Sequence, residues 1–342
     1  MDINKLVRKN ILKLKPYSSA RDEFEGEASA FLDANENPYP TDYNRYPDPH
    51  QKKLKKIIGK IKNVHEEKIF LGNGSDEPID LLLRAFCEPG SDEVLIPQPT
   101  YGMYAVSASI NNVKVNNVTL TPDFNLDVVP TLAAVAHRTK IIFLCSPNNP
   151  SGNLLRANDV IQVIENFNGI VVVDEAYIDF TESKSFLGFL DRYNNLVVLQ
   201  TLSKAWGLAG IRLGMCFASA EIISVLNKIK PPYNISSLTQ RVAADALAQV
   251  ERKNKMVREI IAERKMMETR LAETEIVECV FPSDSNFLLV RVRKAKQVYS
   301  VLLKRGIAVR DRSSVILCDD CLRITIGAPK ENQMLLDELK KI

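Results

Sequence analysis

Lys204 stands directly beyond an apolar run, Leu196–Gln200, that is typical of a buried β-strand. A lysine condenses with an aldehyde only when its amine is neutral, and both burial and a neighbouring cation lower its pKa toward that state. Arg212 could supply the cation, and together with Ser203 it could donate hydrogen bonds to a phosphate dianion. Because a lysine in a loop is usually solvated, this interpretation needs support from the rest of the chain.

A glycine-containing turn, Gly72–Glu77, lies between an expected strand and a helical pattern. Glycine lets the backbone approach an anion closely, and the free amides of a helix N-terminus, together with Ser75, could bind a phosphate. The alternative is an ordinary helix start, since Asp76 and Glu77 are also favourable in a first turn. The turn therefore indicates a phosphate site only in combination with other residues.

Asp174 ends the apolar run Ile170–Val173. A carboxylate there can cap the local backbone, or it can pair with the protonated ring nitrogen of pyridoxal 5′-phosphate (PLP), which needs an anion to remain an electron sink. Tyr177 and Asn149 could bind the phenolate oxygen of the same cofactor. The phosphate turn, the asparagine, the aspartate and the lysine follow successive expected strands in that order, and this combination predicts a PLP site.

Short apolar runs alternate with helical patterns between about residues 68 and 220, which predicts an α/β fold with a mostly parallel central sheet flanked by helices. Ligands bind beyond the carboxyl ends of the strands in such sheets, and the candidate side chains lie at those ends. The expected strands are Lys68–Leu71, Glu93–Ile96, Val113–Leu120, Lys140–Cys145, Ile170–Asp174, Leu196–Gln200 and Leu213–Ala218.

The pattern changes after Asn234, where a long helix is expected over residues 239–270. We therefore expect a PLP-binding large domain at 41–238, a smaller α+β domain at 239–342, and an N-terminal arm or small-domain segment at 1–40. The small domain is expected to contain strands at 276–281, 287–292, 307–310 and 322–326 and helices near 295–305 and from 330.

Composition and charge exclude several classes of protein. The 45 Lys and Arg residues nearly balance the 42 Asp and Glu residues, which argues against a nucleic-acid binder. No apolar run approaches the length that spans a bilayer and no signal peptide is evident, so we expect a cytoplasmic protein without a membrane partner. Cys318 and Cys321 have the spacing of half a zinc site, but no second pair completes one, so we expect no metal.

The motifs resemble those of the fold-type I, class II aminotransferases, and the resemblance covers essentially the whole chain. The cofactor motifs specify the fold type, whereas the segments 16–21 and 33–38 narrow the resemblance to the branch that acts on histidinol phosphate. The motifs that carry the resemblance are Pro16–Arg21, Asp33–Pro38, Arg45–Pro47, Gly72–Glu77, Pro99–Tyr101, Cys145–Gly152, Asp174–Tyr177, Ser203–Lys204, Ser285–Phe287 and Leu322–Thr325.

The resemblance implies a role for each cofactor residue. Lys204 would hold PLP as a Schiff base and act as the general base, Asp174 would pair with the ring nitrogen, and Tyr101 would stack on the ring. Tyr177 and Asn149 would bind the phenolate oxygen, which makes Lys204, Asp174 and Tyr177 the catalytic residues. The residues that the resemblance places near the phosphate are Ser75, Asp76, Glu77, Ser203, Arg212 and Tyr46 of the partner subunit.

The resemblance also implies a substrate site and a reaction. Arg323 would bind the anionic group of the substrate, assisted by the side chains of Arg310, Tyr17 and Asn37. The implied reaction is transamination of L-histidinol phosphate with 2-oxoglutarate, which gives imidazole-acetol phosphate and L-glutamate in histidine biosynthesis. The enzyme would be a homodimer with active sites at the subunit interface. Two alternatives keep every cofactor residue, namely an aromatic amino-acid aminotransferase and a PLP-dependent decarboxylase of an amino-acid phosphate.

Overall fold

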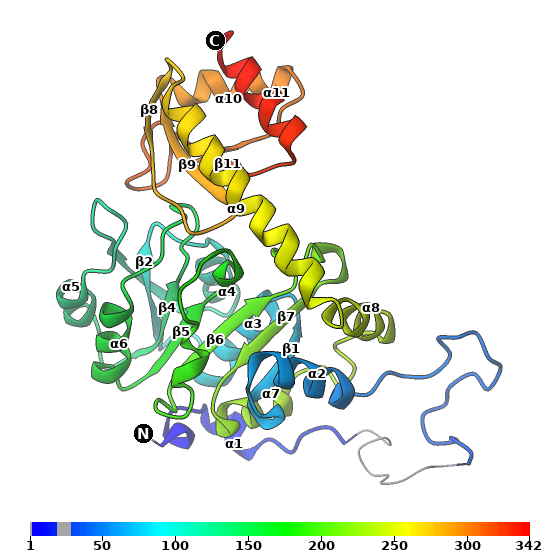
Figure 1. The fold of residues 1–342 in the computed structure, drawn as a ribbon. Coiled ribbons are helices and arrows are strands. Elements are labelled where there is room, and N and C mark those ends of the chain that lie inside the picture. The colour runs from blue at the N-terminus through cyan, green and yellow to red at the C-terminus, as the bar shows by residue number, and fades with distance from the viewer. Residues whose placement is uncertain (1, 19–28) are drawn as a thin grey trace.

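The computed structural model describes residues 2–18 and 29–342, and its largest element is a seven-stranded β-sheet (Figure 1). The strands lie in the order β1-β7-β6-β5-β4-β2-β3. Neighbouring strands are parallel except around β7, which is antiparallel to both β1 and β6. The strands are β1 (Ile69–Asn73), β2 (Glu93–Gln98), β3 (Lys114–Thr119), β4 (Thr139–Cys145), β5 (Ile170–Asp174), β6 (Leu196–Thr201) and β7 (Leu213–Phe217).

Helices cover both faces of this sheet (Figure 1). Alternate residues of β5 therefore enter two different hydrophobic clusters, Val171 and Val173 on one face and Ile170 and Val172 on the other. A strand covered on both sides must be apolar on both sides, which explains its unbroken apolar sequence. The first face is covered by α2 (Lys52–Lys62), α6 (Ala157–Asn166) and α8 (Ser237–Leu247), and the second by α3 (Asp76–Phe86), α4 (Met103–Ile110) and α7 (Ala220–Ile229).

The expected fold class is confirmed, and each of the seven expected strands is present with its ends displaced by at most two residues. The polar ends of β4, β5 and β6 meet at one edge because these three strands are parallel neighbours. The remaining short elements around the sheet are α5 (Val128–Ala133), η2 (Glu66–Lys68), η3 (Ile178–Phe180), η4 (Phe186–Phe189) and η5 (Ala209–Ile211).

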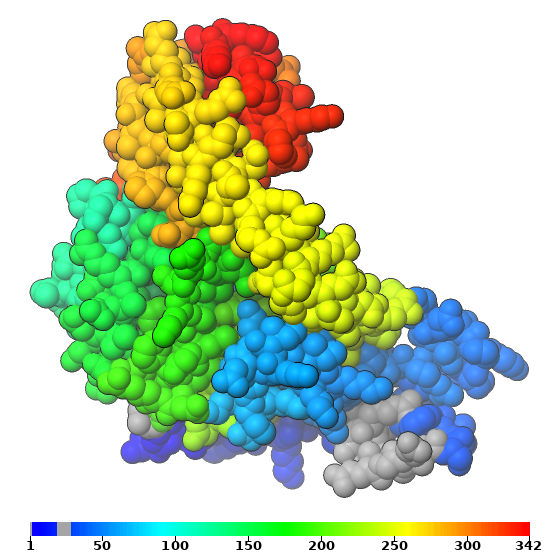
Figure 2. Space-filling model, in the orientation of Figure 1, coloured from blue at the N-terminus to red at the C-terminus, as the bar shows by residue number. Residues whose placement is uncertain are grey.

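The C-terminal residues form a separate lobe that stands on the larger body (Figure 2). Its antiparallel four-stranded sheet has the order β10-β11-β9-β8, and two helices pack on it together with the end of α9. These elements are α9 (Val250–Ala272), β8 (Val277–Val280), β9 (Phe287–Val292), α10 (Ala295–Lys304), β10 (Arg310–Asp311), β11 (Cys321–Thr325) and α11 (Pro329–Leu339).

The helix expected over residues 239–270 is in fact two helices, α8 and α9, separated at Ala248 and Gln249. The two helices bury their apolar residues in different cores, because Ala243 and Leu247 pack on the large sheet and Met267 packs on the small one. The expected strand at 307–310 is also shorter and later, since β10 comprises Arg310 and Asp311 alone.

The N-terminal part of the chain has two short helices, η1 (Ile3–Lys5) and α1 (Lys9–Lys13), and Ile3 and Val7 are buried against the large body. Residues 29–50 instead loop out to the side of the body (Figure 1). Their large side chains are correspondingly exposed, 92% for Leu32 and 75% for Tyr39. Among the described residues, no helix is long and apolar enough to cross a membrane.

A close approach between two backbones positions the turn after β1. Gly214 of β7 lies opposite Gly72, and a Cβ on Gly214 would lie 2.3 Å from the carbonyl carbon of Gly74 and from the amide nitrogen of Ser75. The turn also donates a hydrogen bond from the Gly74 amide to the Arg212 carbonyl, at 2.7 Å. Glycine at position 214 is thus required for the turn to rest on β7.

We expect Gly214→Ala to lower the free energy of unfolding by about 1–3 kcal/mol, because the added methyl group must displace the backbone of the Gly74–Ser75 turn. Denaturant unfolding of the two proteins measures this difference. Gly188→Ala is the matched control, since a Cβ there meets no atom within 4 Å. Equal stability of Gly214→Ala and the wild type would show that the turn does not depend on this approach.

Candidate functional site

A pocket opens at the carboxyl ends of β4, β5 and β6, where Cys145, Asp174 and Thr201 contribute to its lining. Residues from the connections that follow β1, β2, β4, β5 and β6 complete it. The residues singled out from the sequence that the structure brings together in this lining are Ser75, Asp76, Tyr101, Asn149, Asp174, Tyr177, Ser203, Lys204 and Arg212.

Asp174 is 2% exposed, and its carboxylate accepts two hydrogen bonds from the protein. The Tyr104 hydroxyl donates to Oδ2 at 2.6 Å and the Ala176 amide donates to Oδ1 at 3.0 Å. Burial raises the pKa of Asp174, whereas the hydrogen bond from Tyr104 opposes that rise by stabilising the charged form. The ionisation of Asp174 at the end of β5 therefore depends on the hydrogen bonds from Tyr104 and Ala176.

Tyr104 is a residue that the sequence analysis missed. It is fully buried in α4 and its ring stacks on Phe143 at 4.8 Å, so the hydroxyl is fixed against Asp174. In the sequence, Tyr104 lies within an apolar helical pattern and has no feature that distinguishes it from a core residue. Its spacing from Tyr101, three residues and so about one helical turn, is the one signal that could have linked it to the pocket.

Lys204 lies in the loop that leaves β6, with its amine 5.6 Å from the centre of the Tyr177 ring. Burial lowers the pKa of Lys204, and the positive charge of Arg323 lowers it further. Arg212, the cation expected from the sequence, contributes less than Arg323. The surroundings therefore favour the neutral, nucleophilic amine, with the main neighbouring cation coming from the C-terminal lobe.

The opposite end of the pocket is suited to an anion. Ser75 and Asp76 lie at the N-terminus of α3, where backbone amides have no partners within the helix. Arg212 contributes a guanidinium 3.7 Å from Asp76, and Tyr101 donates a hydrogen bond to the same carboxylate at 3.1 Å. Ser203 follows from the β6 side, with its hydroxyl 3.0 Å from Thr201.

Glu77 lies outside the lining of the pocket. Its carboxylate accepts hydrogen bonds from the Asn73 amide and from the side chain of Asn234, at 3.1 and 3.2 Å for the latter. Asn234 also donates to the Leu71 carbonyl at 2.9 Å. Glu77 thus stabilises the turn that contains Ser75 through these hydrogen bonds.

Arg323 reaches the pocket from β11 and donates a hydrogen bond to Asn149 Oδ1 at 2.6 Å. Its guanidinium also lies 5.2 Å from the ring centre of Phe287, which contacts Tyr177 edge to face. Because the Asn149 oxygen is occupied, its side-chain nitrogen remains to donate to a ligand, and no described residue accepts from it.

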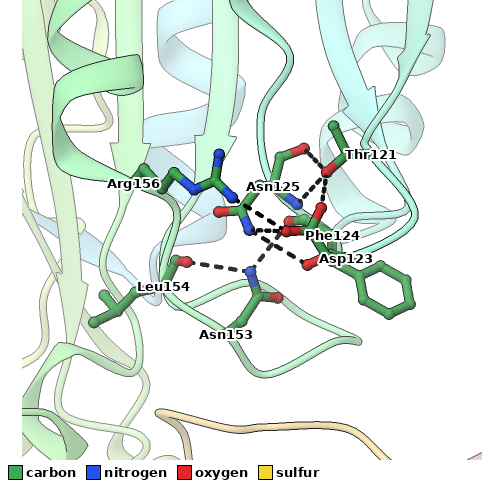
Figure 3. Close-up of polar contacts among 7 residues, drawn as sticks. All are labelled: Thr121, Asp123, Phe124, Asn125, Asn153, Leu154 and Arg156. Carbon is green, nitrogen blue, oxygen red and sulfur yellow. Dashed lines mark hydrogen bonds and ion pairs between the residues drawn. The ribbon is translucent and has the colours of Figure 1, made fainter.

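The loop that carries Asn149 is held by polar contacts with the segment after β3 (Figure 3). Asn153 donates to the carbonyls of Phe124 and Leu154, both at 3.1 Å, and Arg156 pairs with Asp123 at 3.3 Å (Figure 3). The Asn148 amide in turn donates to the Asn153 carbonyl at 2.8 Å. Asn149 is therefore placed by a fixed loop.

Besides Glu77 and Arg323, four residues singled out from the sequence lie outside this lining. Tyr17 is 74% exposed, and Tyr46 is 52% exposed and stacks on Tyr233 at 4.5 Å. Asn37 is exposed and accepts a hydrogen bond from the Tyr39 amide at 2.9 Å. Arg310 is exposed on β10, opposite Arg323 in register. Residues 19–21 of the expected motif at 16–21 lie outside the described residues.

Comparison with known proteins identifies the family. The family model for aminotransferases of class I and II matches residues 28–339. The chain belongs to this family. It is 56% identical to the histidinol-phosphate aminotransferase of Parabacteroides distasonis over 341 residues, which cover 100% of this chain and 99% of the relative.

Solved structures of related proteins have the same fold. The histidinol-phosphate aminotransferase from Clostridium acetobutylicum superposes with a TM-score of 0.81 at 26% identity, over 88% of this aminotransferase and 91% of the other chain. The histidinol-phosphate aminotransferase from Sinorhizobium meliloti, solved in complex with pyridoxal 5′-phosphate, superposes with a TM-score of 0.81 at 23% identity, over 88% and 83% of the two chains.

We expect Tyr104→Phe to lower the free energy of unfolding of the cofactor-free aminotransferase by about 1.5–3 kcal/mol near neutral pH, because a buried carboxylate loses a donor. The pKa of Asp174 is raised in the folded state, so the free energy of unfolding falls as the pH rises through that pKa. The hydrogen bond from Tyr104 stabilises the charged carboxylate and so makes this fall smaller. The penalty should therefore shrink at lower pH, where Asp174 is protonated. Denaturant unfolding across pH measures this dependence.

Tyr299→Phe is the matched control, since its hydroxyl makes no hydrogen bond within the described residues. A penalty for Tyr104→Phe that is independent of pH would mean that the tyrosine acts through packing alone.

Proposed function

We propose that this aminotransferase uses PLP to transfer the amino group of L-histidinol phosphate to 2-oxoglutarate, giving imidazole-acetol phosphate and L-glutamate in the cytoplasm. The observation that carries the proposal is the full-length relationship, at 56% identity, to a histidinol-phosphate aminotransferase. The pocket supports it, because Arg323 supplies a guanidinium beside Lys204 and Asn149.

The residues of the pocket fit PLP. Asp174 faces the pocket as a buried carboxylate that a protonated ring nitrogen would satisfy, and the amides of α3 with Ser75, Ser203 and Arg212 would hold the phosphate. Tyr101 would pack on the ring face. When bound, PLP withdraws electrons from the substrate carbon that bears the amine.

Lys204 is the residue that we propose to move the proton. Burial and Arg323 lower the pKa of its Nζ, which would take the proton from the amine-bearing carbon of the substrate and deliver it again within the same pocket. Asp174 would keep the ring nitrogen protonated, while the Tyr177 hydroxyl and the Asn149 side-chain nitrogen would donate to the phenolate oxygen.

Arg323 would receive both substrates. Glutamate carries a carboxylate where histidinol phosphate carries a phosphate on a methylene group, and a guanidinium binds either oxyanion through parallel hydrogen bonds. The half-exposed position of Arg323 at the end of β11 leaves its donors available beside the pocket.

The substrate proposal is tested by mixing the PLP enzyme with histidinol phosphate, phenylalanine or threonine phosphate. We expect fastest loss of the absorbance of the covalently bound cofactor with histidinol phosphate, with a ketone product and no carbon dioxide. Faster conversion of phenylalanine would favour the aromatic aminotransferase, and release of carbon dioxide from threonine phosphate would favour the decarboxylase.

We expect Lys204→Ala to lose the absorbance of the covalently bound cofactor and to lower turnover by at least about 100-fold, since both the attachment and the proton transfer depend on Nζ. Absorption spectroscopy and single-turnover assays measure the two effects. Lys184→Ala, in an exposed loop, is the control and should change neither. A covalent cofactor spectrum in Lys204→Ala would overturn the assignment.

We also propose a homodimer in which Tyr46 of the partner subunit completes the site. Much of the segment 29–50 loops out beside its own body (Figure 1). The exposed side chains of Leu32 and Tyr39, and the half-exposed ring of Tyr46, leave an apolar surface that a second copy would bury. Tyr17 and Asn37 also lie in the N-terminal part of the chain and would reach the site in the same assembly.

Mixing Lys204→Ala with Tyr46→Ala subunits tests this arrangement. A mixed dimer would contain one intact site if Tyr46 acts in its partner, so random assembly should recover about a quarter of wild-type activity, because half of the dimers are mixed and each has one working site of two. Each variant alone is the control. No recovery, with mixed dimers present by native mass spectrometry, would place Tyr46 in its own subunit.

A further inference from the structure

A third arginine, Arg312, lies on the same face of the small sheet as Arg310 and Arg323. Arg310 is opposite Arg323 in the β10–β11 register, and the Arg312 amide continues the pairing by donating to the Cys321 carbonyl at 2.9 Å. Side chains alternate between the faces of a strand pair, so these three guanidinium groups share one face. The intervening Leu322 packs into the core of the lobe on the other face.

That face is turned toward the pocket. Leu289, the neighbour of Arg323 on β9, packs with residues of the large body, and Arg323 itself bonds to Asn149. The charges of both Arg312 and Arg323 act on the Tyr177 hydroxyl, which belongs to the lining of the pocket. Arg312 thus lies beside the place where Arg323 enters the site.

The guanidinium of Arg312 has no partner in the described part of the chain. Its Nε is buried and makes no hydrogen bond, and no carboxylate of the described residues forms an ion pair with it. Burial lowers the pKa of Arg312, and the charges of Arg323 and Arg310 lower it further. A buried donor without an acceptor destabilises a fold, and such a group in a native protein requires an explanation.

A dianion would satisfy this cluster better than a carboxylate. A phosphate monoester carries close to two charges and three terminal oxygens, so it can accept from more than one guanidinium, whereas a carboxylate has one charge and two oxygens. Arg323 alone is sufficient for a carboxylate. Arg310 and Arg312 provide positive charge in excess of what glutamate needs.

We propose that Arg312 is a specificity-determining residue that binds the phosphate monoester of the amino donor beside Arg323. The inference rests on the proposed function and deepens it. Arg312 selects phosphorylated donors over donors that carry only a carboxylate at this position.

The test is Arg312→Gln in the PLP-loaded enzyme, with KM measured separately for histidinol phosphate and for glutamate. Loss of a charge-assisted hydrogen bond to the phosphate should raise the KM for histidinol phosphate relative to the KM for glutamate by about 10- to 100-fold. Arg312→Lys keeps the charge without the planar donor pair and should restore part of the ratio. Arg293→Gln, which removes an exposed arginine paired with Glu275, is the charge-matched control and should leave the ratio unchanged.

Binding of inorganic phosphate to the same proteins, followed by calorimetry, gives a readout that does not depend on turnover. We expect Arg312→Gln to weaken phosphate binding by the same factor as the KM ratio. An equal rise of both KM values, or unchanged phosphate affinity, would overturn the proposal and leave Arg312 a structural residue.

The two proposals fail in different ways. If the wild-type enzyme does not convert histidinol phosphate, the proposed function is wrong, and the effect of Arg312→Gln on phosphate affinity still decides the role of this arginine. If the wild type converts it and the variant keeps the wild-type KM ratio, only the role of Arg312 is wrong.

Discussion

The burial of the Asp174 carboxylate at the end of β5 is the constraint on which the arrangement of the pocket depends. β5 lies in the middle of the sheet and is covered on both faces, so a charge at its end is largely removed from water. Burial raises the pKa of Asp174 and lowers the pKa of Lys204, so both groups are shifted toward their neutral forms. A ring nitrogen that shares a proton with Asp174, and an aldehyde that reacts with Lys204, would relieve both shifts.

The C-terminal lobe also influences the pKa of Lys204, through Arg323. Arg323 is the strongest cation acting on Lys204, and it holds the oxygen of Asn149. The lobe also contacts the Asn149 loop through its backbone, because the Asp284 amide donates to the Gly152 carbonyl at 2.8 Å. The pKa of Lys204 and the orientation of the Asn149 side chain therefore depend on how this lobe packs on the large body.

The sequence was sufficient to predict the strands and the polar residues at their ends, because both are local patterns repeated from strand to strand. Tyr104 was not predictable in this way, since a tyrosine inside an apolar helix has the same pattern as a core residue. The break between α8 and α9 at Ala248 and Gln249 has no glycine or proline to mark it. Tyr17, Asn37 and Tyr46 lie outside the lining of the pocket in the single chain, and in the proposed homodimer they would reach it only through a second copy.

The antiparallel strand β7 has a consequence for how the site assembles. Because β7 returns directly beside β6, with Thr201 opposite Gly214, the connection between them brings Lys204 and Arg212 to one edge across a short loop. Closing a short loop has a low entropic cost, whereas the bond between Arg323 and Asn149 joins residues 174 positions apart. Lys204 and Arg212, the residues that we propose to hold the cofactor, are thus near neighbours along the chain and can be brought together early in folding. The contact of Arg323, the residue that we propose to bind the substrate, with Asn149 forms only when two segments far apart in the sequence have met.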